Sequence, residues 1–162
     1  MASWHSRCPG AAAGRISRTR AVPDNGTRQR LEHDVDAWVA TADEDGTPYL
    51  VPLSFLWDGT TLLISMAGAS PTARNLLANG KVRVSVGLVR DVVLIEGTAR
   101  ATPATEIPAE EGDAFAEKAG FDPRKEAGSH HYFHITPHRL QAWRESNELA
   151  GRDLVRDGVW TV

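Results

Sequence analysis

The sequence predicts a mainly β fold, a small closed or partly closed barrel of five or six short, mostly antiparallel strands. The length of 162 residues and the hydrophobic content of 41% suit one domain with one core. Apolar side chains alternate with a period of two over most of the chain after Trp38. Turn signals such as Asp58–Gly59 separate these segments. A short helix interrupts the series after the third strand, and a longer helix follows the fifth.

The first 30 residues differ in charge from the rest of the chain. They hold six arginines against one acidic residue, whereas residues 31–162 hold 12 basic and 20 acidic residues. Residues 1–27 contain little apolar material, so we interpret them as a flexible basic extension; a transit peptide or a translation start placed too early are the alternatives. The folded domain is expected over residues 28–162. Leu31 and Val35, four residues apart, predict a lead-in helix over Arg28–Asp36.

Three strands are predicted next. Alternation begins at Trp38, and Gly46 supplies the positive φ of the hairpin turn that follows. The second strand, Tyr49–Trp57, is rich in β-branched and aromatic residues and has one apolar face. Pro52 within it cannot donate to a ladder, which indicates an edge, a bulge or a ligand on that side. The third strand is expected over Thr60–Met66.

A helix start is the next signal in the chain. Ser70 is a suitable N-cap, Pro71 fits the first helical position, and Gly80 ends the helix. Two strands follow. In the first of them the alternating residues are Val82, Val84, Val86 and Leu88, and the second is expected over Asp91–Ala101.

The C-terminal part is expected to contain a helix and a last long strand. Pro108–Gly120 is amphipathic, and Phe121–Ser129 has the composition of a loop. The sixth strand begins with Tyr132–Ile135 and continues through Trp143. Asp157–Gly158 is a further turn signal. The tryptophans that we expect in the core or in an interface are Trp38, Trp57 and Trp160.

Composition excludes several classes of protein. No apolar run approaches the ~20 residues of a membrane-spanning helix. The net charge of −8 over residues 31–162 does not suit a nucleic-acid binder, because phosphate backbones are bound by neutralising cations. Cys8 is the single cysteine, so no intrachain disulfide forms and the cytoplasm is the expected compartment. We therefore expect neither a membrane nor a nucleic acid as a partner.

The common catalytic and metal motifs are absent. The sequence has no P-loop, no G-x-G-x-x-G, no H-E-x-x-H, no G-x-S-x-G and no C-x-x-C. Four histidines cluster in the sixth predicted strand: His130, His131, His134 and His138. On a helix three of them would share one face and could hold a metal, but the aromatic and β-branched residues between them favour a strand. We therefore predict no metal site, and we assign no catalytic residue.

The segment with the most chemical content joins the third strand to the helix that follows it. Its polar residues are Ser65, Ser70, Thr72, Arg74 and Asn75. Free backbone N–H groups and the positive end of the helix dipole attract an anion at such a place. An arginine adds a planar, charged hydrogen-bonding group. The residues alone therefore indicate a phosphate site, and an ordinary Ser-Pro helix cap with a surface arginine is the alternative.

The order and spacing of four segments resemble the pyridoxamine 5'-phosphate oxidase-like family of flavin-binding split barrels. These segments are Trp38–Gly59, Leu63–Ser65, Ala73–Leu76 and Leu94–Ala99, and the resemblance covers about Asp36–Trp143. It implies a six-stranded antiparallel split β-barrel with a short helix after strand 3 and a longer helix after strand 5. It also implies a homodimer with two flavins, most often FMN, bound at the subunit interface.

By position, the resemblance divides the expected FMN contacts into three groups. Beside the isoalloxazine ring would lie Val51, Pro52, Leu53 and Ser54. The ribityl phosphate would be faced by Ser65, Ser70, Thr72, Arg74 and Asn75, and Trp143 would pack on the flavin from the second chain. Family members often carry lysine or arginine at the positions of Pro71 and Thr72, so Arg74 is the cation left in this element, with Arg83 and Arg90 as further candidates. The Arg/His pair that holds the vitamin in true pyridoxamine phosphate oxidases has no match here.

The expected function is thus an FMN-dependent oxidoreductase, a homodimer that acts on a small organic molecule by hydride transfer at the flavin. One alternative is a deazaflavin-dependent reductase of the same fold. Another is a barrel that stores or senses flavin or haem without turnover, in which His130–His138 would be the segment to suspect for haem. The substrate and the electron donor are not indicated by the residues.

Overall fold

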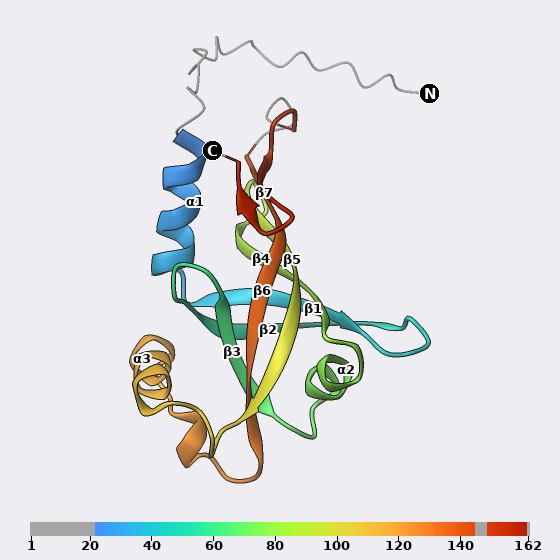
Figure 1. Ribbon diagram of the computed structural model, residues 1–162, viewed down its shortest axis with the longest axis vertical. Helices are drawn as coiled ribbons and strands as arrows, with labels where there is room; N and C mark the ends of the chain where they lie inside the picture. Colours follow the sequence, from blue (N-terminus) through green and yellow to red (C-terminus); the bar gives the residue numbers. More distant parts are fainter. Residues whose placement is uncertain (1–21, 145–148, 162) are drawn as a thin grey trace, which may run out of the picture.

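The computed structural model describes residues 22–144 and 149–161, and it shows a closed antiparallel barrel (Figure 1). Six strands follow one another in the order β3-β2-β1-β4-β5-β6, and β6 pairs with β3 to close the barrel. They are β1 (Asp36–Ala42), β2 (Pro48–Trp57), β3 (Leu62–Ala67), β4 (Lys81–Leu88), β5 (Asp91–Pro103) and β6 (His130–Trp143). Two short strands, β7 (Asp153–Arg156) and β8 (Val159–Trp160), extend the sheet from β6. The predicted mainly β class and six-stranded antiparallel barrel are confirmed.

The described part of the chain also forms helices α1 (Val22–His33), α2 (Pro71–Asn79) and α3 (Ala109–Ala119), and the 3₁₀ turn η1 (Pro123–Lys125). The predicted helices after the third and fifth strands are confirmed as α2 and α3. Figure 1 shows them on opposite sides of the lower half of the barrel, while α1 stands beside the C-terminal hairpin. None of the described helices has the length and apolar character needed to cross a membrane.

The bounds of the lead-in helix were predicted wrongly. Helix α1 begins at Val22 rather than Arg28 and ends at His33. Of the two apolar residues behind the prediction, Leu31 is fully buried, but Val35 lies beyond the helix and is exposed. In the middle of the helix, the Arg28 guanidinium lies 4.1 Å from the ring centroid of Trp160. Residues 1–21 of the expected extension lie outside the described residues.

Two hydrophobic clusters hold the fold together. Inside the barrel the buried side chains include Val39, Phe55, Ile64, Val84, Ile95 and Leu140. A second cluster fills the space between α3 and the outer face of β3 and β6, with Leu63, Ile107, Phe115 and Tyr132. Trp57 and Trp160 pack against the first cluster, as predicted. Trp38 is 50% exposed, so within one chain it is outside the core.

Strand β6 continues past Pro137 because the barrel accommodates an extra residue there. Glu96 pairs with Arg139 and Gly97 pairs with Pro137, so His138 is the additional residue of a β-bulge. The sequence did not predict β7, whose residues Leu154 and Val155 are buried. The predicted turn at Asp157–Gly158 joins β7 to β8.

Candidate functional site

The chain between β3 and α2 folds as the sequence predicts. Ser70 is the N-cap of α2, and its Oγ accepts a hydrogen bond of 3.2 Å from the Ala73 amide. Pro71 occupies the first helical position, and Gly80 ends the helix in the left-handed region with φ of 66°. Two loop contacts fix the approach to the helix: Gly68 donates to the Ser129 carbonyl, and Ser70 donates to the Ala67 carbonyl.

Few backbone donors stay free at this helix start. Pro71 has no N–H group, and the Ala73 amide is bound by Ser70 Oγ. The Arg74 amide donates to the Ser70 carbonyl at 3.0 Å. Within the described residues, only the Thr72 amide of the first turn lacks an acceptor. The physical reason is that the Ser-Pro pair, which marks the helix start, itself satisfies or removes the neighbouring donors.

Two neighbouring side chains of α2 point to different roles. Arg74 is exposed, and no described residue pairs with its guanidinium. Asn75 is 9% exposed, and its Nδ2 donates to Thr41 Oγ1 of β1 at 3.1 Å. Arg74 is therefore available to an anion from solution, whereas Asn75 attaches the helix to the barrel.

The predicted ring-binding residues lie where β2 and β3 separate. The β2–β3 pairing covers Phe55–Trp57 and Leu62–Ile64 and then stops, so Ser54 and Ser65 flank the split. Ser54 Oγ donates to Asp36 Oδ1 at 2.7 Å, and Ser65 Oγ donates to the His131 carbonyl at 3.1 Å. Both hydroxyl protons are therefore used within the protein.

The part of β2 before this split is a free edge, on which no described strand pairs. The Phe55 amide donates on the β1 side, to the Val35 carbonyl. Backbone groups alternate in direction along a strand, so those of Pro52 and Ser54 face the free edge. Val51 and Leu53 face the barrel interior and are half-buried. Of the three readings of Pro52, an edge, a bulge or a ligand, the structure shows an edge.

Trp143 lies far from Ser65 within one chain. Ser65 pairs with Tyr132 near the start of β6, whereas Trp143 pairs with Val92 at its end. Eleven residues of strand separate Tyr132 and Trp143, roughly 35 Å. The Arg152 guanidinium lies 5.4 Å from the ring centroid of Trp143. No local pattern in the sequence indicates Arg152, because its contact with Trp143 depends on the antiparallel pairing of β7 with β6.

Two carboxylates, those of Asp153 and Asp91, bind arginine side chains near the end of the barrel at which Trp143 lies. The Asp153 carboxylate accepts hydrogen bonds from Arg139, Arg156 and Gln141, which lower its pKa below the usual range. Burial alone would raise the pKa of Asp91, but hydrogen bonds from Arg30 and Arg144 lower it overall. The Asp153 contacts tie β7 to β6, so they also fix the position of Arg152.

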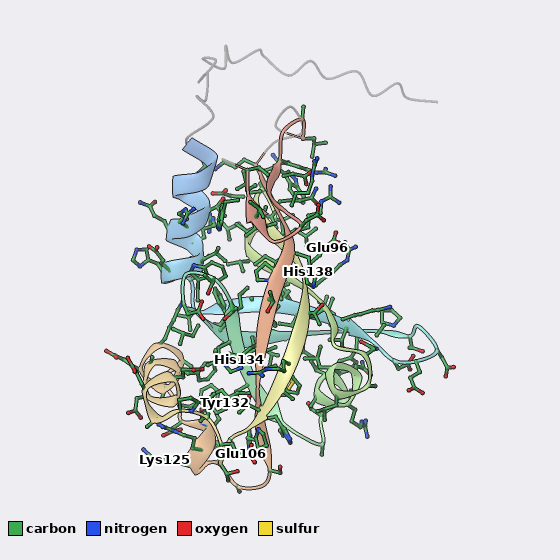
Figure 2. The ribbon with its side chains drawn as sticks, viewed as in Figure 1. Glu96, Glu106, Lys125, Tyr132, His134 and His138 are labelled. Atoms are coloured by element: carbon green, nitrogen blue, oxygen red, sulfur yellow. The ribbon has the colours of Figure 1, made fainter. Side chains whose placement is uncertain are left out.

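The histidines of β6 do not converge. The strand conformation confirms that they share no helical face, and Figure 2 shows His138 well separated from His134 along the strand. His134 Nε2 lies 2.7 Å from Glu111 Oε2 of α3, and His138 Nε2 lies 2.6 Å from Thr98 Oγ1. No group of three potential metal ligands occurs among the described residues. The Nδ1 atoms of His130, His131 and His134 are buried and have no hydrogen-bond partner among the described residues.

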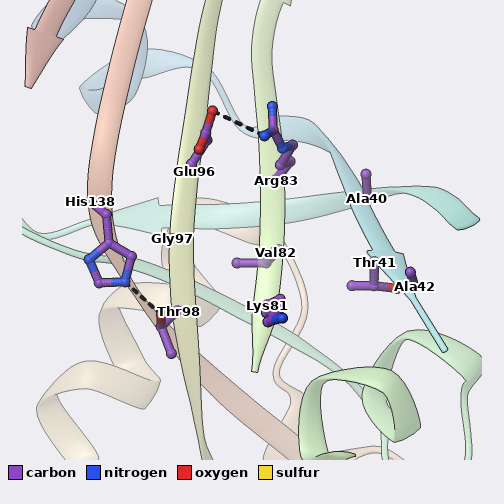
Figure 3. A pocket seen from close by; sticks show the side chains of 10 residues that line it. All are labelled: Ala40, Thr41, Ala42, Lys81, Val82, Arg83, Glu96, Gly97, Thr98 and His138. Atoms are coloured by element: carbon purple, nitrogen blue, oxygen red, sulfur yellow. Dashed lines mark hydrogen bonds and ion pairs between the residues drawn. The ribbon is translucent and has the colours of Figure 1, made fainter. Parts of the chain in front are cut away.

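A separate pocket of about 460 Å³ lies on the outward face formed by β1, β4, β5 and β6 (Figure 3). Arg83, which the sequence offered as a further cation for the phosphate, lines this pocket, whereas none of the other residues expected to contact the flavin does. The pocket is linked to those other residues by Thr41, whose hydroxyl accepts the hydrogen bond from Asn75. The pocket is thus separate from the β2 edge and the start of α2.

Several solved structures share the fold. One described as an F420 reductase has 20% sequence identity and a TM-score of 0.57, and the match covers 70% of this chain and 94% of that one. HupZ from Group A Streptococcus has 22% identity and a TM-score of 0.56, with 79% and 95% covered. HutZ, the heme storage protein from Vibrio cholerae, has 15% identity and a TM-score of 0.59, with 74% and 94% covered. At these identities the likeness concerns the fold alone.

None of the curated protein sequences matches the chain. A family model does match, and it spans residues 26–144, from helix α1 to the end of the barrel. That range includes all six barrel strands, α2 with its Ser-Pro start, and α3. The chain therefore belongs to the pyridoxamine 5'-phosphate oxidase family.

Proposed function

We propose that the protein is an FMN-dependent oxidoreductase that works as a homodimer on a small organic substrate. The observation that carries the proposal is the exposed Arg74 guanidinium, which has no partner among the described residues and stands at the start of α2. In a family named for a flavin-using oxidase, such a cation beside a helix start and a free strand edge suits a flavin nucleotide.

The start of α2 fits a terminal phosphate. Three donors remain there after the internal hydrogen bonds are counted. The Thr72 amide lacks an acceptor in the described part of the chain, and Ser70 Oγ accepts from Ala73, so its own proton is available. Arg74 supplies the charge. The positive end of the helix dipole favours an anion at the same place.

The free edge of β2 fits the ring system. A flavin ring is flat and carries both carbonyl and N–H groups on its pyrimidine side. The backbone of Pro52 and Ser54 faces the free edge and offers a carbonyl at each residue and one amide donor, at Ser54. Pro52 removes a donor that would otherwise meet the ring without an acceptor.

An exposed apolar patch on the outer face of β1 and β2 supports the homodimer. Trp38 of β1 is 50% exposed and lies directly opposite Pro52, and Leu50 of β2 is 59% exposed. A patch of this kind suits a two-fold interface between identical chains. A second chain would also supply Trp143 and Arg152, which a single chain holds far from α2.

The bound flavin would supply hydride transfer. The chain's residues hold and orient it: Arg74 and Thr72 bind the phosphate, the β2 edge fixes the ring plane, and apolar residues exclude water from one face. No side chain is assigned as an acid or a base.

The proposal is tested by titrating the purified protein with FMN and following flavin fluorescence and absorption. Arg74→Ala should weaken binding by about 1.5–3 kcal/mol, roughly tenfold or more, because a charged hydrogen bond is lost. Arg74→Lys should retain part of the affinity. The matched control is Arg100→Ala, which removes an exposed arginine from β5 and should bind FMN as the native chain does.

The same titration distinguishes the other cofactors of this fold. A protein that ignores FMN but binds a deazaflavin or haem would refute the FMN assignment. Bound FMN that is bleached by a nicotinamide donor and recovers its colour with an acceptor would establish turnover. The variant Trp38→Glu should shift the dimer to monomer and weaken FMN binding together. Sedimentation combined with the FMN titration therefore tests whether the site is formed by two chains.

A further inference from the structure

The pocket on the outward face of β4, β5 and β6 has the size and chemistry of a second binding site (Figure 3). Its volume of about 460 Å³ lies within the usual range for small-molecule sites. Small residues, Ala40, Ala42 and Gly97, leave the space open. Polar side chains from three strands surround it: Lys81, Arg83, Glu96, Thr98 and His138.

The hollow is built into the backbone by the β-bulge. Glu96 pairs with Arg139 and Gly97 with Pro137, so His138 is displaced outward as the extra residue. A Cβ atom on Gly97 would lie 2.7 Å from the Thr136 carbonyl oxygen. It would also lie 2.8 Å from Cγ2 of the buried Ile135, so a side chain at Gly97 is excluded on the barrel side of the strand.

The charges around the pocket favour an anion. The Arg83 guanidinium lies 3.1 Å from Glu96 Oε1, and the Arg139 guanidinium lies 3.9 Å from the same oxygen, so both arginines have an acidic partner. The Lys81 ammonium has no partner within the described residues and is the uncompensated charge. Residues 31–162 carry a net charge of −8, so a locally positive pocket is unusual on this surface.

A hydroxyl held by an imidazole adds a directed donor. His138 Nε2 lies 2.6 Å from Thr98 Oγ1, and the dashed line in Figure 3 marks this contact. When the imidazole donates its Nε2 proton to Thr98 Oγ1, the hydroxyl proton of Thr98 remains available. In that tautomer His138 would be a positioning residue, because it would leave the Thr98 hydroxyl proton for a bound group.

We propose that this pocket binds a small organic carboxylate, independently of the flavin. Lys81 pairs with the carboxylate, Thr98 donates a hydrogen bond to it, and the apolar part of the molecule lies over Ala40 and Ala42. A carboxylate carries one negative charge, which matches the one uncompensated cation. A phosphate dianion would require a second, and Arg83 is already held by Glu96.

The test uses benzoate as the probe and benzyl alcohol as its uncharged counterpart. Amide chemical shifts of the native chain are followed up to about 10 mM probe, which covers weak, millimolar affinities. Benzoate should give saturable shifts at Lys81, Gly97 and Thr98. Lys81→Gln should weaken benzoate binding at least threefold, Lys81→Arg should retain it, and His138→Ala should weaken it to a smaller extent.

The flavin-site variant serves as the matched control. Arg74→Ala should leave benzoate binding unchanged, and Lys81→Gln should leave FMN binding unchanged, so failure at one site is distinguishable from failure at the other. The proposal is overturned if benzyl alcohol binds as tightly as benzoate, if Lys81→Gln has no effect, or if the shifts centre on α2.

Discussion

Replacing Gly97 by alanine should destabilise the barrel by about 2–3 kcal/mol. The added Cβ would lie 2.7 Å from the Thr136 carbonyl oxygen and 2.8 Å from Cγ2 of Ile135. Ordinary contacts begin at 3.4 Å, so each neighbour would have to move by at least 0.6 Å. Ile135 is fully buried in the barrel core, and Thr136 belongs to the same strand. Neither can yield without moving β6 away from β5.

The assay is urea denaturation at a fixed protein concentration, followed by tryptophan fluorescence. Gly26→Ala is the matched control, because its nearest neighbour would be Arg144 at 3.7 Å and its φ is not positive. Gly26 lies inside α1, where alanine is favoured over glycine by up to about 1 kcal/mol, so this variant should be as stable as the native chain or more stable. A Gly97→Ala protein with the native unfolding free energy and an unchanged m-value would refute the steric reasoning.

Three further predictions concern polar side chains. Asp91→Asn should lower the unfolding free energy by about 0.5–1 kcal/mol near neutral pH. Burial raises the pKa of Asp91, but hydrogen bonds from two guanidinium groups outweigh it and lower the pKa overall. The loss of unfolding free energy in the variant should therefore be full above about pH 4 and vanish as the pH falls through the lowered pKa. Urea denaturation curves measured across this pH range check it. Asn75→Ala should lower the unfolding free energy by about 1–2 kcal/mol, because the hydrogen bond to Thr41 is lost. A double-mutant cycle with Thr41→Val should show that the two residues are coupled, and additive effects would contradict the hydrogen bond. Tyr132→Phe should leave the thermal unfolding temperature unchanged or raise it, because the buried hydroxyl has no hydrogen-bond partner in the described part of the chain. A clear decrease in that temperature would show that the hydroxyl does have such a partner.

Much of the fold was predictable because its signals are local. The α2 boundaries follow from Ser70, Pro71 and Gly80, each of which acts on backbone groups within one helical turn. Alternation in β2 correctly placed Phe55 inside the barrel. The free edge of β2 was indicated by Pro52, whose missing N–H group is a property of the residue itself.

The candidate site was predictable only in part. The local fold around Ser70 was predictable, because the cap and the helix start involve residues close in sequence. Which donors at the helix start stay free was not predicted; the structure shows that Ser70 binds the Ala73 amide. The burial of Asn75 against Thr41 joins residues 34 positions apart, and no local pattern indicates such a pair.

The sequence by itself determined where strands, turns and helix ends occur, because hydrophobic periodicity and residues such as glycine and proline constrain the backbone within a few positions. Only the tertiary structure decided the start of α1, the addition of β7 and the pocket beside His138. The last two depend on the register between distant strands: the β6–β7 pairing, and the extra residue next to the Gly97–Pro137 pair. Register is set when the whole barrel closes, because each strand is held by the strands on both sides of it.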